Sequence, residues 1–161
     1  MSWEHYWENR KDLQYYKVVK KWLEELGPKD SIIDVGCGGC PVATWGEFKS
    51  RTAINREPFF AINNVNCVID DWLDYETKPV DVITCLQVLE HFTSKTIDLF
   101  VEKIFANCKI AIISVPYMWE KGSCEDHVQD PINLIKFINL IKREPIKLEI
   151  TNDHRMVGMF I

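Results

Sequence analysis

The sequence predicts an α/β fold in one domain: a seven-stranded, mostly parallel sheet with a C-terminal antiparallel hairpin and helices on both faces. Three observations support this prediction. Short apolar runs alternate with longer stretches whose apolar residues recur at helical spacing. The first apolar run ends abruptly at Gly36 and Gly38, as strands do at the carboxyl edge of an open α/β sheet. The last two runs, 146–151 and 156–161, flank a short turn and predict the hairpin.

Composition limits the classes of function. A chain of 161 residues is long enough to bury one core. Its net charge of −5 gives no general basic surface and disfavours a nucleic-acid partner. No stretch reaches the ~18 apolar residues of a membrane span, and the N-terminus lacks a signal-peptide pattern. We therefore expect a cytoplasmic protein without membrane contact; the pattern carries no signal for its oligomeric state.

Six cysteines lie along the chain, and two of them, Cys37 and Cys40, have the C-x-x-C spacing of redox and zinc sites. No second C-x-x-C or paired histidine motif completes a zinc site. The cysteines in or beside predicted strands have the character of small core residues. We expect incidental thiols and no metal, with a thiol redox protein as an open alternative.

The first predicted element is a helix over 3–26, with an interruption near Asn9. Gly27-Pro28 ends the helical pattern. The residues that recur at helical spacing are Trp7, Tyr15, Val18, Val19, Trp22, Leu23 and Leu26. The beginning of this segment is unusually aromatic, which makes it a candidate for more than packing.

The next element is a buried strand that ends in the glycine loop. Glycines at 36 and 38 let the backbone turn sharply and let a ligand approach without a Cβ in the way. Asp34, directly before the turn, can accept hydrogen bonds from loop amides or help to place a cationic ligand group. This loop is the predicted cofactor site.

The string hydrophobic-Asp34-Val-Gly36-Cys37-Gly38 resembles motif I of class I S-adenosylmethionine-dependent methyltransferases. The resemblance implies a Rossmann-like methyltransferase fold in which Asp34, Gly36, Cys37 and Gly38 surround the amino-acid end and ribose of the cofactor. The dinucleotide fingerprint requires a third glycine, where this chain has Pro41. A nicotinamide-dependent oxidoreductase is therefore the weaker alternative.

The second strand is predicted over 51–55, after a short helix within 42–50. The resemblance implies an acidic residue at the end of this strand that holds both ribose hydroxyls. Asn55 stands nearest to that place and Glu57 follows two residues later. Asn55 departs from the family pattern, and both residues stay candidates for the ribose contact.

A third strand over 66–69 is followed by Asp70, Asp71 and Trp72. The resemblance implies that an acidic side chain here accepts a hydrogen bond from the adenine amino group. Asp71 is the first candidate and Asp70 the second, while Trp72 offers a flat apolar surface for the ring.

The fourth strand, 80–85, runs into Val88-Leu-Glu-His91. That string resembles a motif of small-molecule methyltransferases, among them the ubiquinone-biosynthesis O-methyltransferases. The resemblance places Leu86 and Gln87 beside the methionine part of the cofactor. His91 is a candidate catalytic residue; alternatively, Glu90 and His91 are a charged pair that fixes the following helix.

The remaining predicted elements are a helix over 94–107, a strand over 109–115 and a helix over 132–142. The loop before the last helix carries functional residue types. Tyr117 and Trp119 are candidates for acceptor contacts, and His127 is the first candidate for a general base, oriented by Asp126 or Asp130. In the alternative interpretation, Asp130 caps the next helix, with Pro131 at its first position.

Taken together, the sequence predicts one methyltransferase domain, with an N-terminal helix or lid over 1–27 and a Rossmann-like core over 28–161. The resemblance implies that Trp3, Tyr6 and Trp7 of the lid line the acceptor pocket. The expected reaction is methyl transfer from S-adenosylmethionine to a small-molecule or glycan acceptor by in-line displacement, which releases S-adenosylhomocysteine. A non-catalytic module that binds this cofactor or a partner is the alternative that the neutral Asn55 favours.

Overall fold

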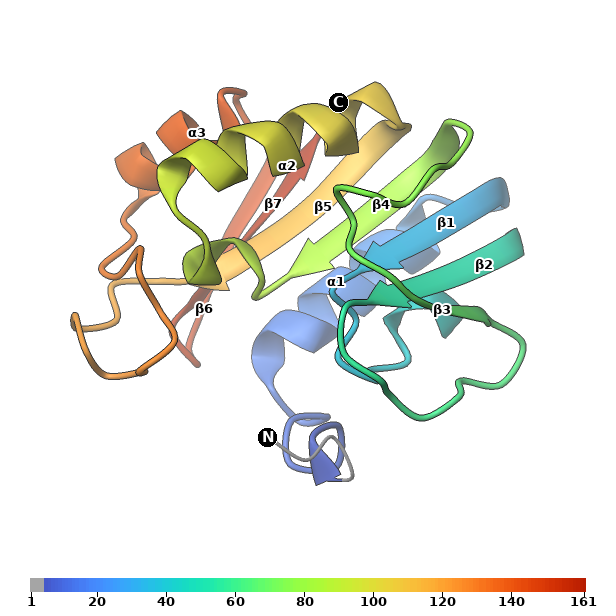
Figure 1. The fold of residues 1–161 in the computed structure, drawn as a ribbon, viewed down its shortest axis with the longest axis horizontal. Coiled ribbons are helices and arrows are strands. Elements are labelled where there is room, and N and C mark those ends of the chain that lie inside the picture. Colours follow the sequence, from blue (N-terminus) through green and yellow to red (C-terminus); the bar gives the residue numbers. More distant parts are fainter. Residues whose placement is uncertain (1–4) are drawn as a thin grey trace.

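The computed structural model describes residues 5–161 as a seven-stranded sheet flanked by helices (Figure 1). Trp3, a predicted acceptor contact, lies outside the described residues. The strands are β1 Lys29–Val35, β2 Phe48–Asn55, β3 Asn66–Ile69, β4 Val80–Leu86, β5 Cys108–Pro116, β6 Lys147–Thr151 and β7 Arg155–Phe160. The helices are α1 Gln14–Glu25, α2 Ser94–Ala106 and α3 Leu134–Ile141, with short 3-10 turns η2 Val42–Thr44 and η3 Leu89–His91.

The strand order is β3-β2-β1-β4-β5-β7-β6. Strands β1 to β5 pair in parallel, whereas β7 pairs antiparallel with both β5 and β6. The order in which strands are added to the sheet reverses at β1, because β2 and β3 lie on one side of it and β4 and β5 on the other. This is the position where open α/β sheets bind ligands. The predicted sheet with its C-terminal hairpin is confirmed.

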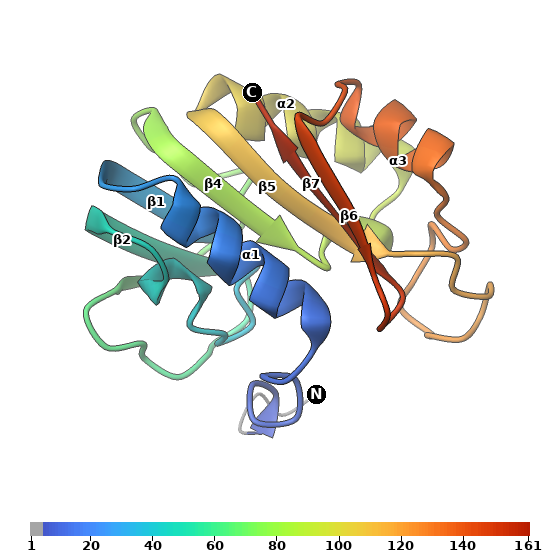
Figure 2. The same cartoon turned by 180° about the vertical axis from the view of Figure 1, so that it is seen from behind.

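Helices cover both faces of the sheet, as predicted. Helices α2 and α3 lie on one face and α1 crosses the other (Figure 2). Each face has its own apolar cluster: Phe100 and Phe137 belong to the first, Tyr15 and Leu23 to the second. Alternate residues of the central strands serve the two clusters, as the pleat requires. Ile33, for example, faces α2 while Ile32 faces α1.

Helix α1 begins at Gln14, so the helix predicted to start at residue 3 is shorter than expected. Residues 5–12 form turns. The reason is tertiary: Leu13 provides no side-chain cap, whereas Asp153 Oδ2, from the β6–β7 turn, accepts from the backbone N–H groups of Gln14 and Tyr15 at 2.6 and 3.4 Å. Unsatisfied N–H groups at a helix start require such an acceptor, and here a distant residue supplies it.

The helix predicted within 42–50 is reduced to the single turn η2, and β2 begins earlier than expected, at Phe48. Gly46 adopts φ +70°, and a Cβ there would lie 2.8 Å from the Leu23 carbonyl oxygen. The Arg51 guanidinium donates to the carbonyls of Ala43 and Gly46 at 2.6 and 2.8 Å. These contacts hold the segment as a turn.

The last helix begins at Leu134 rather than at Ile132. Asn133 is its N-cap, because Asn133 Oδ1 accepts from the Lys136 N–H at 2.8 Å. The expectation that Asp130 caps this helix, with Pro131 as its first residue, was therefore wrong. Asp130 is available for another contact.

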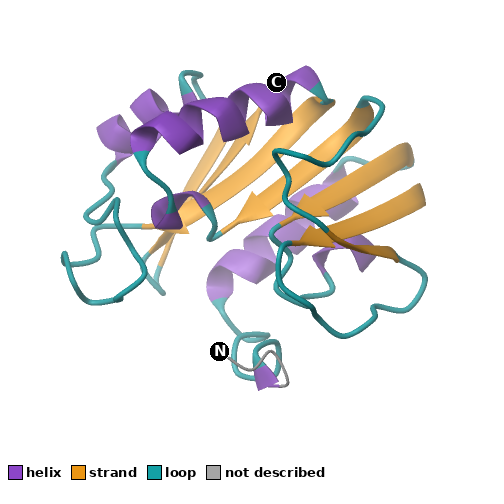
Figure 3. Ribbon diagram, in the orientation of Figure 1, coloured by secondary structure: helices purple, strands orange, loops and turns teal. Residues whose placement is uncertain are grey.

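Loops leave the arrowheads of the parallel strands and gather at one edge of the sheet (Figure 3). The crossovers around β1, β2 and β3 contain no α-helix, whereas α2 connects β4 to β5 and α3 lies between β5 and β6. Within residues 5–161, no helix is both long and apolar enough to span a bilayer.

Candidate functional site

The glycine loop begins where β1 ends. The N–H groups of Gly36 and Cys37 both donate to the Ile54 carbonyl, at 2.8 and 3.1 Å, which anchors the loop to β2. Gly36 has φ +71°, and a Cβ there would lie 2.5 Å from Val88 Cγ2. The positive φ and the lack of space for a Cβ both require glycine here. The closeness of Val88 shows that the loop lies directly against the segment that follows β4.

Asn55 supports the loop with its side chain. Its Oδ1 accepts from the Gly38 N–H at 3.2 Å, and its Nδ2 donates to the Glu57 carbonyl at 2.8 Å. The residue is 8% exposed, so both halves of the amide are used within the protein. An ionised aspartate could not make the second bond because it has no donor. This explains an asparagine at this position.

Glu57 differs from Asn55 in exposure. Its side chain is 62% exposed, and its nearest cation is Arg56, with Nε 3.9 Å from Oε1. Contacts of this exposed kind contribute little free energy. Glu57 therefore presents a carboxylate close to the end of β2, where the ribose contact was predicted.

Asp34 is buried in the strand that leads into the loop. Its Oδ1 accepts from Thr84 Oγ1 at 2.6 Å, while Oδ2 has no hydrogen-bond partner among the described residues. Burial raises the pKa of the carboxyl to about 7, and the bond from Thr84 opposes this shift. An unpartnered buried carboxylate oxygen costs free energy, which a ligand cation would offset.

Asp70 and Asp71 follow β3 at the same edge of the sheet. Asp70 Oδ1 accepts from the Asp71 N–H, and Asp71 Oδ1 accepts from the Leu73 N–H, at 2.8 and 2.9 Å. The Asp70 N–H donates to the Asn55 carbonyl, which joins this turn to the end of β2. The two carboxylates thus lie beside the glycine-loop region, each with one internal hydrogen bond.

Trp72 does not offer the open surface that the sequence led us to expect. It is 3% exposed and packs in the core against Phe100, with ring centroids 6.5 Å apart. Lys103 Nζ lies 5.2 Å from the centre of its ring. The aromatic face is therefore occupied, and the indole supports helix α2.

Leu86 and Gln87 connect β4 to the following turn. Leu86 is buried. Gln87 adopts φ +56°, a conformation that costs a non-glycine residue free energy, and its Nε2 donates to Ser114 Oγ at 3.1 Å. Strained backbone of this kind is found at functional sites, and the place of Gln87 beside the cofactor stays a prediction.

The two thiols of the C-x-x-C pair are buried. Burial raises the pKa of Cys40 to about 12 and raises that of Cys37 as well. Cys40 Sγ lies 3.1 Å from the Tyr16 hydroxyl. Reactive thiols are partly exposed and have a lowered pKa, so this environment disfavours the redox alternative.

His91 and His127 lie together beyond β4. Their rings meet edge to face, with centroids 4.8 Å apart. His127 Nδ1 lies 2.7 Å from Asp130 Oδ2, which is the contact that replaces the expected helix cap, and His91 Nδ1 lies 3.1 Å from the Asp126 carbonyl. Burial, then the neighbouring His127, lowers the pKa of His91.

Glu90, expected only as part of a charged pair, is 1% exposed and faces this cluster. Burial raises the pKa of its carboxyl to about 8, and the charge of Asp130 adds to the shift. Its backbone carbonyl accepts from the N–H groups of Val128 and Gln129, which fixes the 117–130 loop against η3.

Aromatic and cationic side chains border the histidines. The Trp119 ring stacks on His127 with centroids 5.5 Å apart, and its Nε1 donates to the His154 carbonyl. The Arg155 guanidinium lies 5.1 Å from the Trp119 ring centre and 5.3 Å from that of Tyr15. No sequence signal indicated Arg155. Tyr117, partly buried, packs against the core beneath this loop.

The N-terminal segment brings Tyr6 and Trp7 onto the α1 face. Trp7 packs against Tyr16 and Trp45, with centroids 5.1 and 6.0 Å away. The Arg10 guanidinium lies 4.4 Å from the centre of the Tyr6 ring. Tyr6 and Trp7 both pack against the apolar cluster on this face, and burial is the main cause of the raised pKa of Tyr6.

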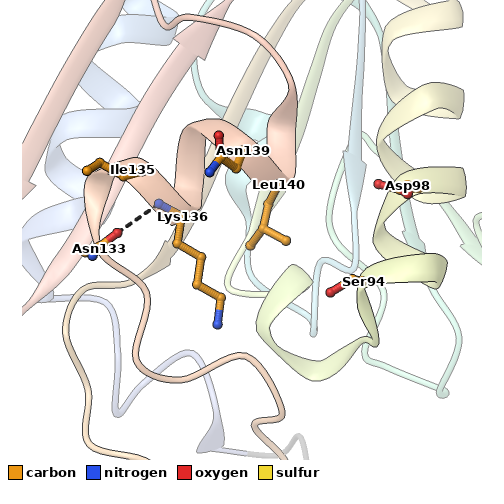
Figure 4. Close-up of a pocket in the computed structure, with 7 residues that line it drawn as sticks. All are labelled: Ser94, Asp98, Asn133, Ile135, Lys136, Asn139 and Leu140. Carbon is orange, nitrogen blue, oxygen red and sulfur yellow. Dashed lines mark hydrogen bonds between the residues drawn. The ribbon is translucent and has the colours of Figure 1, made fainter.

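A surface hollow of about 510 Å³ lies between α2 and α3 (Figure 4). Asp98, Asn133, Lys136 and Leu140 are among its lining residues. Figure 4 shows Asp98 on one helix, Lys136 and Leu140 on the other, and Asn133 at the start of α3. None of the predicted site residues lines this hollow.

This strand order, with a glycine loop after β1, is the fold of class I S-adenosylmethionine-dependent methyltransferases. The chain resembles the N-methyltransferase NodS from Bradyrhizobium japonicum WM9, solved with S-adenosylhomocysteine, at TM-score 0.71 and 12% identity over 91% of this chain and 85% of that one. It also resembles a Haloferax volcanii protein solved with the Trm112 methyltransferase activator, at TM-score 0.72 and 10% identity over 97% and 93% of the two chains.

The small RNA methyltransferase HEN1 shares the fold at TM-score 0.73 and 16% identity, over 91% of this chain and 24% of that one. No family model and no curated protein sequence matches the chain. At these identities the likeness establishes the fold and confirms the fold that the sequence predicted. The site residues have to be argued from their own geometry.

Proposed function

We propose that the protein transfers a methyl group from S-adenosylmethionine to a small-molecule or glycan acceptor. The observation that carries the proposal is the glycine loop with the unpartnered Oδ2 of Asp34 behind it, at the carboxyl edge of a sheet with methyltransferase strand order. Similar structures solved with S-adenosylmethionine or S-adenosylhomocysteine support the choice of cofactor.

The residues around the loop fit this cofactor. Asp34 offers a buried acceptor for its ammonium group, and Glu57 offers an exposed carboxylate for the ribose hydroxyls. Asn55 would act indirectly by holding Gly38 in position. Asp71 remains the first candidate for the adenine amino group, with Asp70 second. When bound, the cofactor supplies an electrophilic methyl group on a sulfonium.

The acceptor site is proposed between the N-terminal segment and the 117–130 loop, where Tyr6, Trp119 and the histidines supply aromatic and polar contacts. Methyl transfer from a sulfonium proceeds by in-line displacement, so positioning of an oxygen or nitrogen nucleophile carries much of the rate. His127 is the candidate base because Asp130 Oδ2 contacts its Nδ1 and leaves Nε2 without that partner, so that Nε2 could accept a proton from the acceptor. His91 is the second candidate.

Calorimetric titration with S-adenosylmethionine, S-adenosylhomocysteine and NADH tests the proposal. We expect both adenosyl ligands to bind and NADH not to bind. Glu57→Gln should weaken adenosyl binding about tenfold, which corresponds to one lost hydrogen bond to a charged group. Glu144→Gln, an exposed glutamate outside the site, is the matched control and should bind as the wild type does.

The outcomes separate the alternatives. Binding of NADH instead of the adenosyl ligands would favour an oxidoreductase, and absence of all binding would overturn the proposal. Adenosyl binding without release of S-adenosylhomocysteine, across small-molecule and glycan acceptors, would favour the non-catalytic module.

A further inference from the structure

Three metal-ligating side chains converge beyond the carboxyl end of β4. Glu90, His91 and His127 each offer one ligand atom, and these atoms lie within 4.8 Å of one another. They come from two segments, η3 and the 117–130 loop, which the Glu90 carbonyl joins by two hydrogen bonds. Two imidazoles and one carboxylate are a ligand set that divalent transition metals use in catalytic sites.

The contacts behind the histidines are those of metal ligands. A ligating histidine usually donates its other ring N–H to a carboxylate or a backbone carbonyl, which fixes the tautomer and orients the ring. His127 Nδ1 lies 2.7 Å from Asp130 Oδ2, and His91 Nδ1 lies 3.1 Å from the Asp126 carbonyl. In the neutral tautomer whose Nδ1 donates to these acceptors, Nε2 carries the lone pair that an ion would bind.

Glu90 supplies an independent observation. The residue is 1% exposed, and its Oε2 is a buried atom without a hydrogen-bond partner among residues 5–161. Burying an unpartnered carboxylate oxygen costs free energy. A cation between the carboxylate and the two imidazoles would provide the missing partner.

We propose that Glu90, His91 and His127 bind one divalent transition-metal ion, with zinc as the reference ion. Bonds of about 2.1 Å from a zinc ion bring its ligands to roughly 3.4 Å from one another, so the three side chains would close in by about 1 Å when the ion binds. Three protein ligands leave at least one coordination position open.

The site lies next to the proposed cofactor loop, since Val88, two residues before Glu90, occupies the space beside Gly36. The role of the ion rests on the proposed function: it would bind an acceptor hydroxyl and favour the loss of its proton. The histidines would then act as ligands rather than as the general base. Among the acceptors considered, this role favours one with a hydroxyl group.

Metal binding is tested on the full chain after treatment with a chelator. Calorimetry with Zn²⁺ should give one ion per chain, and Co²⁺ should produce visible absorption bands without the near-ultraviolet band of a cobalt thiolate. His91→Ala and Glu90→Gln should each weaken binding at least 100-fold. His91 is exposed, so its truncation does not open the core. Circular dichroism checks that both variants fold.

Matched controls make the test specific. His5→Asn and His154→Asn replace the two histidines outside the cluster and should leave the affinity unchanged. Asp130→Asn changes only the partner of His127 and should weaken binding 10–100-fold. A cobalt thiolate band, or equal affinity in His91→Ala and wild type, would overturn the proposal.

Titration of the same preparations with S-adenosylmethionine separates the two proposals. Zinc binding without adenosyl binding would leave the metal site intact and remove methyl transfer. Adenosyl binding with no zinc bound by the wild type would do the reverse.

Discussion

The glycine loop and the histidine cluster lie next to each other and are built in different ways. Backbone hydrogen bonds to Ile54 and the side-chain amide of Asn55 hold the loop, so its conformation is fixed without a ligand. Side chains hold the cluster, and two of its buried carboxylate oxygens, Glu90 Oε2 and Asp130 Oδ1, have no hydrogen-bond partner among the described residues. The loop backbone is preformed, with the unpartnered Asp34 Oδ2 behind it, whereas the cluster needs a ligand between its side chains to complete it.

The two regions should therefore respond differently to substitution. Substitutions in the loop should first affect folding, because loop residues contact the protein itself. Substitutions in the cluster should first affect ligand binding.

Gly36→Ala should have the largest effect. Alanine would have to adopt the positive φ of Gly36, and its Cβ would lie 2.5 Å from Val88 Cγ2. These two costs should together lower the free energy of unfolding by about 3–4 kcal/mol. Urea unfolding measures this. The double variant Gly36→Ala, Val88→Ala should recover the part due to the collision; a double variant without any such recovery would refute the steric explanation.

Each ligand should stabilise only through its own site. Zinc at 100 times its wild-type dissociation constant should raise the free energy of unfolding of the wild type by about 2.7 kcal/mol and that of His91→Ala by at most about 0.4 kcal/mol. S-Adenosylhomocysteine should stabilise His91→Ala as it does the wild type. Unfolding with and without each ligand measures the effects, and a zinc effect of wild-type size in His91→Ala would contradict the contrast.

Asn55→Ala should lower the free energy of unfolding by about 2 kcal/mol, because two hydrogen bonds are lost and the Gly38 N–H is left without its acceptor. Zinc affinity should not change. Glu144→Ala, at an exposed site away from both regions, serves as the control for the unfolding measurement. A loss of zinc binding in Asn55→Ala would show that the loop and the cluster are not independent.

Asp34→Asn should stabilise the protein at pH 8. The pKa of Asp34 is about 7 in the fold against 3.8 ordinarily, so the native state holds a proton that the unfolded chain loses, and stability falls as pH rises from about 4 to about 7. This pKa difference destabilises the wild type at pH 8 by about 4 kcal/mol relative to low pH, and Asp34→Asn removes that cost. The new amide has an unpartnered N–H group, which costs about 2–3 kcal/mol. The variant should therefore gain about 1–2 kcal/mol in its free energy of unfolding.

Urea unfolding at pH 5 and pH 8 tests this prediction. The variant should lose the decline between these pH values that Asp34 causes in the wild type. Equal pH dependence in the two proteins would show that Asp34 does not hold its proton in the fold.

The sequence predicted the strands well because apolar runs and glycine turns are local signals. The third strand, Asn66–Ile69, has the predicted bounds, and the others differ by a few residues. The errors have tertiary causes. Asp153 caps α1 from another part of the chain, and Asn133 takes the capping role that the Asp130-Pro131 pattern indicated.

The candidate site was predictable in part. The motif resemblance indicated the glycine loop and His91, and the residue types of the 117–130 loop indicated His127. No local pattern could show that Asn55 is used internally or that Trp72 is buried. Glu90 and His91 lie far from His127 in the sequence, and only the folded chain brings the three side chains together. The expectation of no metal rested on cysteine spacing, which does not report on such a cluster.

The contact between Asp153 and the start of α1 has a consequence for synthesis on the ribosome. The acceptor that satisfies Gln14 is encoded 139 positions later, so the first helix emerges long before its cap exists. Until the β6–β7 hairpin has been translated, the N–H group of Gln14 lacks this acceptor and can bond only to water. Completion of the first helix and closure of the last strands are thus one late event in the making of this protein.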